Sequence, residues 1–262
     1  MIGIFDSGLG GLSFVTELEK TLPQYSFSYI GDHLRVPYGG RSKEAIQTFT
    51  EQGVQKLWKL GAKIIIIACN TASAEALRYI QQKYPDKKVL GILIPAVEQA
   101  LETPGHIGVI ATRATVSIGA YPREIEKRDP GRKVFQQEAP LLVPFIEEGM
   151  GKSPECRRLM RRYLRSLKNA GIQTLVLGCT HYPLIEEVFR HHVGARIKII
   201  NSGKAAAEKL KIYFENHPEI EKNLEKSGEK NFYTTDKPEN FEKQMKRFYS
   251  GDIRVQKICL TS

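Results

Sequence analysis

The stretch IIIIACNTAS, residues 64–73, is the clearest indication of the fold class in the sequence. Its isoleucines and Ala68 form a short apolar run, which is typical of a parallel strand that helices cover on both faces. The polar residues Asn70, Thr71 and Ser73 follow at once, and such side chains favour the start of a helix. A strand that passes directly into a helix indicates one unit of an α/β fold.

A second stretch repeats this pattern further along the chain. TLVLGCTHYP, residues 174–183, again contains an apolar strand, a small residue, a cysteine and a helix start. IGIFDSG, residues 2–8, and GHIGVIATRAT, residues 105–115, are also alike, since each is a strand followed by a polar loop. These echoes predict two related α/β lobes that face each other.

Short apolar runs alternate with amphipathic segments along most of the chain, which predicts mainly parallel strands flanked by helices. The expected strands are residues 2–5, 26–31, 63–68, 89–93, 106–110, 174–178 and 196–200. The expected helices are residues 11–21, 43–60, 72–84, 154–170, 183–191 and 204–216. We expect residues 1–94 and 203–262 to form the first lobe and residues 95–202 the second.

The composition limits the class of protein. Of 262 residues, 41% are hydrophobic and 26% are charged, which is typical of a globular domain. No apolar run approaches the roughly 20 residues of a membrane span, and Met1 leads into apolar residues without the basic start of a signal peptide. We therefore expect a cytoplasmic protein. The net charge of +10 favours an anionic small-molecule substrate or nucleic acid.

Two of the four cysteines lie where chemistry is expected. Cys69 and Cys179 each follow a predicted strand, and ligands of open α/β sheets bind beyond the carboxyl ends of strands. A helix N-terminus stabilises a thiolate, so we expect a lowered pKa for Cys69. His181 is a titratable partner that could form an activated pair with Cys179. A buried core thiol is the alternative for each cysteine, but their matched contexts favour a function.

Two such thiols suit the inversion of an amino-acid α-carbon. One thiolate removes the α-proton from one face, and the opposite thiol returns a proton to the other face. Because the α-proton is a very weak acid, preorganised donors must stabilise the developing negative charge.

Two loops carry candidate binding groups. In DSGLGG, residues 6–11, Asp6 could hold a substrate ammonium or orient its neighbours, and the glycines leave N–H groups free for an anion. Ser13 stands where a third glycine would complete a dinucleotide motif, which disfavours such a site. In the loop of residues 31–41, N–H groups near Gly39 could meet a carboxylate.

Other polar residues have simpler interpretations. Glu147 is expected in a solvated pair with Glu148, although it could pair with His181. Thr112 and Thr115 could bind a carboxylate, but helix capping is the simpler role. Five arginines recur on one face of the helix expected at residues 154–170, namely Arg157, Arg158, Arg161, Arg162 and Arg165. Such a face is usually solvated, and contact with nucleic acid is the alternative.

Four ordered segments resemble the signature segments of glutamate racemases: IGIFDSGLGGLSF, YIGDHLRVPYGGRS, ACNTASA and LGCTHYPLI. The resemblance extends from Ile2 to about Leu184. It implies two pseudosymmetric α/β lobes with the active site between them, and two-base interconversion of L- and D-glutamate through a carbanion-like state. It also implies that neither pyridoxal phosphate nor a metal is used, that D-glutamate is supplied for peptidoglycan, and that the protein forms a homodimer.

The resemblance assigns residues to the site. Cys69 and Cys179 match the family's proton-transfer cysteines. The polar residues that assist them are matched by Asp6, Glu147 and His181. The substrate-contacting positions are matched by Ser7, Tyr38, Gly39, Asn70, Thr71, Thr115 and Thr180, together with Asp6 and His181. The chain departs from the family at Ala111, often glycine, at Ala139, often cysteine, and at Asn201, usually aspartate.

Two other functions stay open at this point. The first is another enzyme of the same fold, such as an aspartate racemase or a decarboxylase. A decarboxylase needs only one protonating cysteine, so the pair argues against it. The second is a binding protein whose arginine face, residues 157–165, contacts nucleic acid or an acidic partner.

Overall fold

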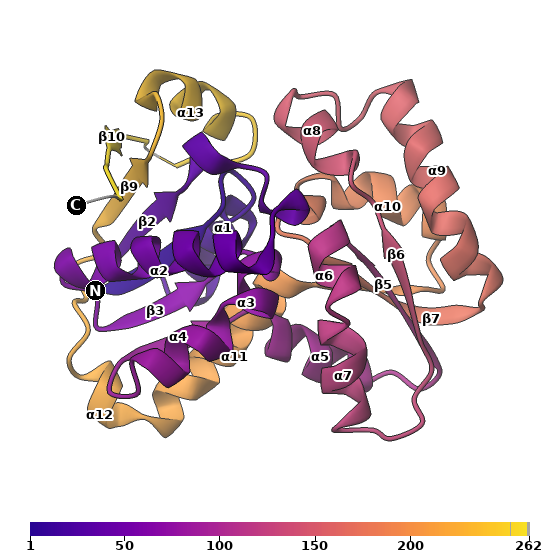
Figure 1. Ribbon diagram of the computed structural model, residues 1–262, viewed down its shortest axis with the longest axis horizontal. Coiled ribbons are helices and arrows are strands. Elements are labelled where there is room, and N and C mark those ends of the chain that lie inside the picture. The colour runs from indigo at the N-terminus through magenta and orange to yellow at the C-terminus, as the bar shows by residue number, and fades with distance from the viewer. Residues whose placement is uncertain (252, 261–262) are drawn as a thin grey trace.

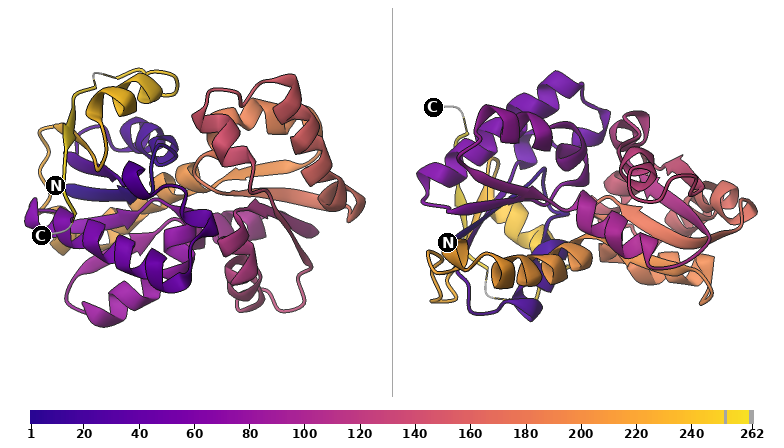
Figure 2. Two further views of the ribbon diagram at one scale, coloured as in Figure 1. Left: turned by 45° about the horizontal axis from the view of Figure 1, so that its top comes forward. Right: turned by 90° about the horizontal axis from the view of Figure 1, so that it is seen from below.

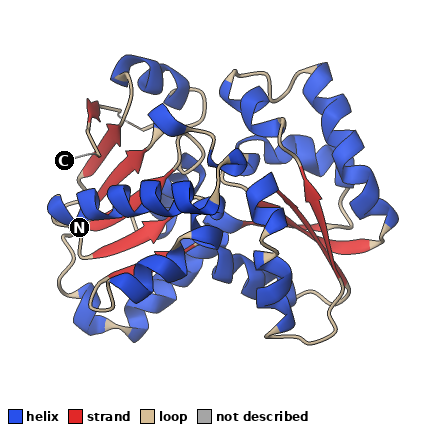
Figure 3. Ribbon diagram, in the orientation of Figure 1, coloured by secondary structure: helices blue, strands red, loops and turns tan. Residues whose placement is uncertain are grey.

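The computed structural model describes residues 1–251 and 253–260, which form two α/β lobes side by side (Figure 1). The first lobe is built on a six-stranded sheet of order β10-β9-β2-β1-β3-β4, and the second on a four-stranded sheet of order β6-β5-β7-β8. Every described strand pair is parallel, which confirms the predicted fold class. Helices lie on both sides of each sheet (Figures 2 and 3).

The strands and helices alternate along most of the chain. The first sheet contains β1 (Ile2–Asp6), β2 (Phe27–Gly31), β3 (Ile64–Ile67), β4 (Lys88–Gly91), β9 (Lys230–Thr234) and β10 (Val255–Lys257). The second contains β5 (His106–Ala111), β6 (Val134–Glu138), β7 (Ile172–Gly178) and β8 (Lys198–Asn201). The α-helices are α1 (Leu12–Thr21), α2 (Lys43–Lys59), α3 (Asn70–Glu75), α4 (Leu77–Lys83), α5 (Leu93–Leu101), α6 (Arg113–Ser117), α7 (Ala120–Glu126), α8 (Leu142–Glu147), α9 (Pro154–Asn169), α10 (Glu186–Val193), α11 (Ser202–Asn216), α12 (Pro218–Glu221) and α13 (Pro238–Met245). Short 3-10 turns occur at η1 (His33–Arg35), η2 (Tyr38–Gly40) and η3 (Tyr182–Ile185).

Strand β3 explains why the first sheet is covered on both faces. Successive side chains of a strand point to opposite faces. Ile64 and Ile66 therefore pack into the core shared with α1 and α11, whereas Ile65 and Ile67 pack into the core beneath α2. Both sets are buried, so the four consecutive isoleucines have the environment that the apolar run predicted.

The parallel arrangement determines where the site forms. β1 is parallel to both β2 and β3, so the segments after Asp6, Gly31 and Ile67 all leave the first sheet at the carboxyl ends of its strands. β5 pairs with β7, so the segments after Ala111 and Gly178 leave the second sheet together. Loops from these two edges meet at the junction between the lobes.

Several elements differ from the prediction. The predicted helix at residues 72–84 is two helices, α3 and α4, that meet at Ala76. The predicted helix at residues 183–191 begins as the 3-10 turn η3 and continues as α10. The sequence pattern also missed β6, β9 and the short helices α5 to α8 and α12. β6 lies at a sheet edge and is only partly buried along its length, so its sequence lacks a continuous apolar run.

The departures from the family pattern fit their surroundings. Asn201 caps α11, because its Oδ1 accepts hydrogen bonds from the N–H groups of Gly203 and Lys204 at 3.0 and 3.2 Å. An aspartate would accept the same bonds. Ala111 and Ala139 are fully buried, and the Ala139 N–H donates to the Ala111 carbonyl at 2.9 Å.

The C-terminal part of the chain returns to the first sheet. β9 pairs with β2, and β10 pairs with β9. The expected lobe limits, 1–94 with 203–262 and 95–202, remain predictions, and residues 252, 261 and 262 lie outside the described part. Among the described residues, no helix is both long and apolar enough to span a bilayer.

Candidate active site

Cys69 lies directly after β3 and caps α3 with its own side chain. Its Sγ accepts a hydrogen bond from the Ala72 N–H at 3.4 Å and donates to Ser7 Oγ at 3.5 Å. We expected polar side chains such as Thr71 and Ser73 to cap this helix, and that prediction was wrong because the cap is Cys69. Burial and the negative charge of Asp6 raise the pKa of Cys69 to about 12, outweighing the hydrogen bonds from Ala72 and Ser7. The expected lowering of this pKa was also wrong, and Cys69 is a thiol at neutral pH.

Cys179 lies directly after β7 and has a different environment. Its Sγ lies 3.8 Å from Nδ1 of His181, whose Nε2 donates to Oε1 of Glu147 at 2.9 Å. Burial alone would lower the pKa of His181, but its contacts with Cys179 and Glu147 raise it to about 10. His181 is therefore an imidazolium at neutral pH, and it stabilises negative charge on the sulfur beside it.

Glu147 ends α8 and is mostly buried at this junction. Burial would raise the pKa of Glu147, but the hydrogen bond and charge of His181, with the charge of His33, lower it. The solvated pair expected for Glu147 and Glu148 is wrong, because only Glu148 is exposed. The pairing with His181, which the sequence left open, is the one present.

Asp6 is fully buried and joins the two lobes. Its Oδ2 accepts from the Gly8 N–H at 2.9 Å, and its Oδ1 accepts from Thr180 Oγ1 at 3.2 Å. Both oxygens thus already have partners within the protein. This geometry favours the orienting role that the sequence offered for Asp6.

Both cysteines line one small cavity between the lobes, with a volume of about 20 Å³. Its wall is formed by Ser7, Val36, Pro37, Tyr38, Gly39, Cys69, Asn70, Thr71, Thr112, Val143, Cys179, Thr180 and His181. Among the expected site residues, Asp6, Glu147 and Thr115 lie behind this wall. Val36 and Val143 were not predicted, because an apolar wall residue has no polar signal that distinguishes it from a core residue.

A cluster of threonines closes one side of the cavity. The hydroxyls of Thr71 and Thr112 lie 2.9 Å apart across the lobes, and Thr115 lies 3.1 Å from Thr112 and 3.4 Å from Thr71. Thr112 stands at the N-cap of α6, but its side chain makes no capping hydrogen bond. The capping role expected for Thr112 is therefore wrong, and its hydroxyl faces the other lobe.

Asn70 is held by residues that the sequence did not single out. Its Nδ2 donates to Ser202 Oγ at 3.1 Å, and its Oδ1 accepts from the Tyr121 hydroxyl at 2.6 Å. Both partners come from segments distant in the sequence. Their side chains fix the orientation of the amide at the start of α3.

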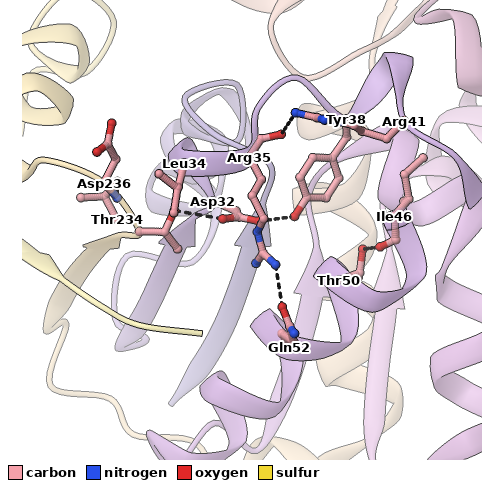
Figure 4. Close-up of polar contacts among 11 residues, drawn as sticks. Asp32, Leu34, Arg35, Tyr38, Arg41, Ile46, Thr50, Gln52, Thr234 and Asp236 are labelled. Atoms are coloured by element: carbon pink, nitrogen blue, oxygen red, sulfur yellow. Dashed lines mark hydrogen bonds and ion pairs between the residues drawn. The ribbon is translucent and has the colours of Figure 1, made fainter. Parts of the chain in front are cut away.

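The loop that carries Tyr38 is anchored by Asp32 (Figure 4). Asp32 Oδ2 accepts from the Tyr38 hydroxyl at 2.5 Å and from Arg35 Nε at 2.6 Å. Arg35 also lies over the ring of Phe49, 4.2 Å from its centroid, and donates to Gln52. Arg35 therefore supports the loop and is not part of the cavity wall.

The wall suits a small polar ligand. It presents hydroxyls, an amide, thiols and the backbone at the start of α3, and His181 is its one charged side chain among the described residues. A helix start with free N–H groups favours a carboxylate. Within residues 1–251 and 253–260, no three His, Cys, Asp or Glu side chains gather as metal ligands would.

Comparisons with known proteins agree with this geometry. The sequence model described as Asp/Glu/Hydantoin racemase matches residues 10–210. The chain is 39% identical to a glutamate racemase of Persephonella marina, over 99% of this chain and 97% of that one. Among solved structures, the glutamate racemase isoform RacE1 of Bacillus anthracis has a TM-score of 0.92 at 32% identity, and the alignment covers 99% and 97% of the two chains. The glutamate racemase of Francisella tularensis, solved in complex with D-glutamate, has a TM-score of 0.91 at 34% identity with the same coverage.

Proposed function

This chain belongs to the Asp/Glu/hydantoin racemase family, and from that premise we propose that it interconverts L-glutamate and D-glutamate by proton transfer between Cys69 and Cys179. The observation that carries this mechanism is the placement of the two thiols, one from each lobe, on the wall of one cavity. Their surroundings differ in charge, since Cys69 is held as a thiol and Cys179 lies beside an imidazolium.

In one direction, the Cys179 thiolate takes the α-proton and forms an S–H bond as the Cα–H bond breaks. The electron pair left on Cα spreads into the adjacent carboxylate. The Cys69 thiol then gives its proton to the opposite face of Cα and becomes a thiolate. The reverse direction begins from that thiolate, so no oxidant or reductant is needed.

The surrounding residues have supporting roles in this proposal. The imidazolium of His181, held by Glu147, stabilises the Cys179 thiolate before proton transfer. Hydroxyls and N–H groups around Ser7, Gly39 and Thr71 bind the substrate carboxylates and the charge that develops on them. Asp6 holds Thr180 in place from the other lobe.

The cavity has to open before substrate enters. A volume of about 20 Å³ holds roughly one water molecule, which is far less than an amino acid needs. Gly39 lies against Thr112 of the second lobe, where an added Cβ would come within 2.6 Å of the Thr112 Cβ. We propose that the loop of residues 36–39 moves away from the second lobe when glutamate binds.

The wider setting follows from the proposed reaction. D-glutamate made in the cytoplasm would supply peptidoglycan synthesis, and a homodimer is the expected assembly. Helix α9 lies on the outer side of the second lobe, away from the junction (Figure 1), and four of its five arginines, Arg158, Arg161, Arg162 and Arg165, are exposed. A solvated face, with no nucleic acid bound, is therefore the simpler interpretation of these arginines.

The test follows conversion of each enantiomer by polarimetry and by chiral chromatography, with EDTA present and pyridoxal phosphate absent. L-glutamate and D-glutamate should each reach an equal mixture, and aspartate should react much more slowly. Faster conversion of aspartate would replace the proposed substrate. Folded protein that converts neither amino acid would contradict the proposed function.

A further inference from the structure

His33, in η1, has one ring nitrogen that the rest of the fold does not explain. Its Nε2 donates to Gln244 Oε1 at 2.9 Å, and its ring packs edge-on against Phe241 at 4.7 Å between centroids. Both partners belong to α13. Nδ1 is buried, and no described residue is its hydrogen-bond partner. A buried polar atom without a partner is costly, so its position calls for a reason.

Nδ1 of His33 and the carboxylate of Glu147 border the same small space above Gly8. A Cβ added to Gly8 would lie 3.5 Å from His33 Nδ1 and 3.6 Å from Glu147 Oε1. This Oε1 is the atom that accepts the hydrogen bond from His181. His33 Nδ1, from the first lobe, and the Glu147 oxygen that binds His181 therefore both lie within 3.6 Å of one point beside Gly8, where Val36 Cγ2 is the nearest atom at 3.1 Å. The charge of Glu147 acts on His33 across this space.

The charged groups that face His33 come from three elements. They are Glu147 at the end of α8, His181 after β7 and Asp6 at the end of β1. Helix α13 contributes the neutral Gln244 and Phe241. Arg247, just after α13, donates to the backbone carbonyl of Glu147 at 3.2 Å. α13 and α8 face each other across the junction in Figures 1 and 2.

We propose that His33 is a positioning residue for Glu147, through which it acts on His181 and Cys179 and makes this end of the site sensitive to acid. The inference rests on the proposed racemase function. When His33 is neutral, Glu147 binds His181 alone. When Nδ1 takes up a proton, it becomes a second donor to the same carboxylate and draws it away from His181.

Burial determines the direction in which the pKa of His33 is shifted. Burial lowers the pKa of His33 from its ordinary 6.5, and this effect outweighs the opposing charge of Glu147 and the hydrogen bond to Gln244. His33 is therefore neutral above pH 7 and takes up its proton only in more acidic solution. Activity that depends on the Glu147–His181 pair should fall there.

The experiment measures kcat/KM against pH in both directions of racemisation, since this quantity reports the ionisations of the free enzyme. His33→Gln removes the titrating group, so the acid-side loss of activity should move to lower pH. Gln244→Glu gives Nε2 a charged acceptor, which favours the imidazolium and should move the acid-side loss upward by about one pH unit. The double variant should show no upward shift, because the responding group is absent.

Two control variants match these changes. His217→Gln removes a partly exposed histidine that pairs with Glu219, and Asn240→Glu adds a negative charge to an exposed position of α13. Both should keep the wild-type dependence of kcat/KM on pH.

An unchanged profile for Gln244→Glu, or an upward shift that persists in the double variant, would overturn the inference. If His33→Gln does not fold, the NMR titration of the His33 ring in wild type and Gln244→Glu decides instead, and equal midpoints would overturn the inference. A wild-type enzyme that racemises nothing contradicts the proposed function, whereas an active enzyme without these shifts contradicts only the role of His33.

Discussion

At the scale of the residue, Cys69 and Cys179 occupy matching positions but differ in electrostatics. Each follows a strand and was recognisable from its sequence context. The sequence could not show that Asp6 and burial would hold Cys69 as a thiol, because these effects depend on packing. It also could not show that Glu147 pairs with His181, since these residues are 34 positions apart. The residue types of the site were thus predictable, and their charge states were not.

Glu147→Gln should keep the shape of the side chain while removing its charge. The imidazolium of His181 then loses a partner that raises its pKa, and kcat/KM should fall by on the order of 100-fold. Steady-state rates in both directions check this. Activity within threefold of wild type would show that the Glu147 charge is not used.

The same pair predicts how stability depends on pH. The pKa of His181 is raised from 6.5 to about 10 in the folded state. The stability gained from its proton is therefore fully present below pH 6.5 and is lost as pH rises through about 10. Urea unfolding at several pH values should show this decline in wild type and a smaller one in Glu147→Gln. If the free energy of unfolding declined equally with pH in both proteins, Glu147 would not be the group that raises the pKa of His181.

At the scale of the element, the strongly apolar strands and long helices were predictable, because burial on both sheet faces leaves a continuous apolar run. β6 was missed because it is only partly buried along its length and so has no such run. The helix predicted at residues 72–84 is interrupted at Ala76, which the sequence pattern did not show. The contact between the loop after β1 and the loop after β7 was also invisible in the sequence. It depends on Gly10, which lies against Thr180 and the backbone of His181.

Gly10→Ala should therefore disturb the Cys179 end of the site. The added Cβ would lie 2.5 Å from Thr180 Oγ1 and 2.8 Å from the His181 backbone nitrogen, so this loop has to shift. Small displacements of catalytic groups cost up to about 100-fold in rate, and we expect kcat to fall by at least about tenfold. Gly40→Ala is the matched control, since a Cβ there meets nothing within 4 Å. Similar kcat values for both variants would contradict this loop contact.

At the scale of the whole molecule, the internal echoes of the sequence predicted two α/β lobes, and the site needs both of them. The hydrogen bonds between Thr71 and Thr112 and between Asp6 and Thr180 cross the junction. The sequence could not predict how tightly the lobes close, because the cavity volume depends on loop packing. It also left open whether the net charge of +10 attracts an anionic substrate or binds nucleic acid.

Reversing charge on α9 separates these two uses. Arg158→Glu, Arg162→Glu and Arg165→Glu together change an outer face that is exposed and absent from the cavity wall. Racemisation should stay within about twofold of wild type, because exposed charges this far from the site are largely screened. A larger loss, or strong salt-sensitive binding of DNA or RNA by wild type that the variant lacks, would favour a second role for this face.

In the proposed mechanism, Cys69 and Cys179 act on opposite faces of one α-carbon. The most direct measurement is α-deuterium incorporation in D₂O, followed by NMR, for Cys69→Ser and Cys179→Ser with each glutamate enantiomer. Each variant keeps one thiol, which still exchanges its proton with solvent. We expect each variant to lose racemisation but to label one enantiomer in preference, and we expect the preferred enantiomer to differ between the two variants. Racemisation at the wild-type rate, or the same enantiomer preference in both variants, would contradict face-specific proton transfer by the two cysteines.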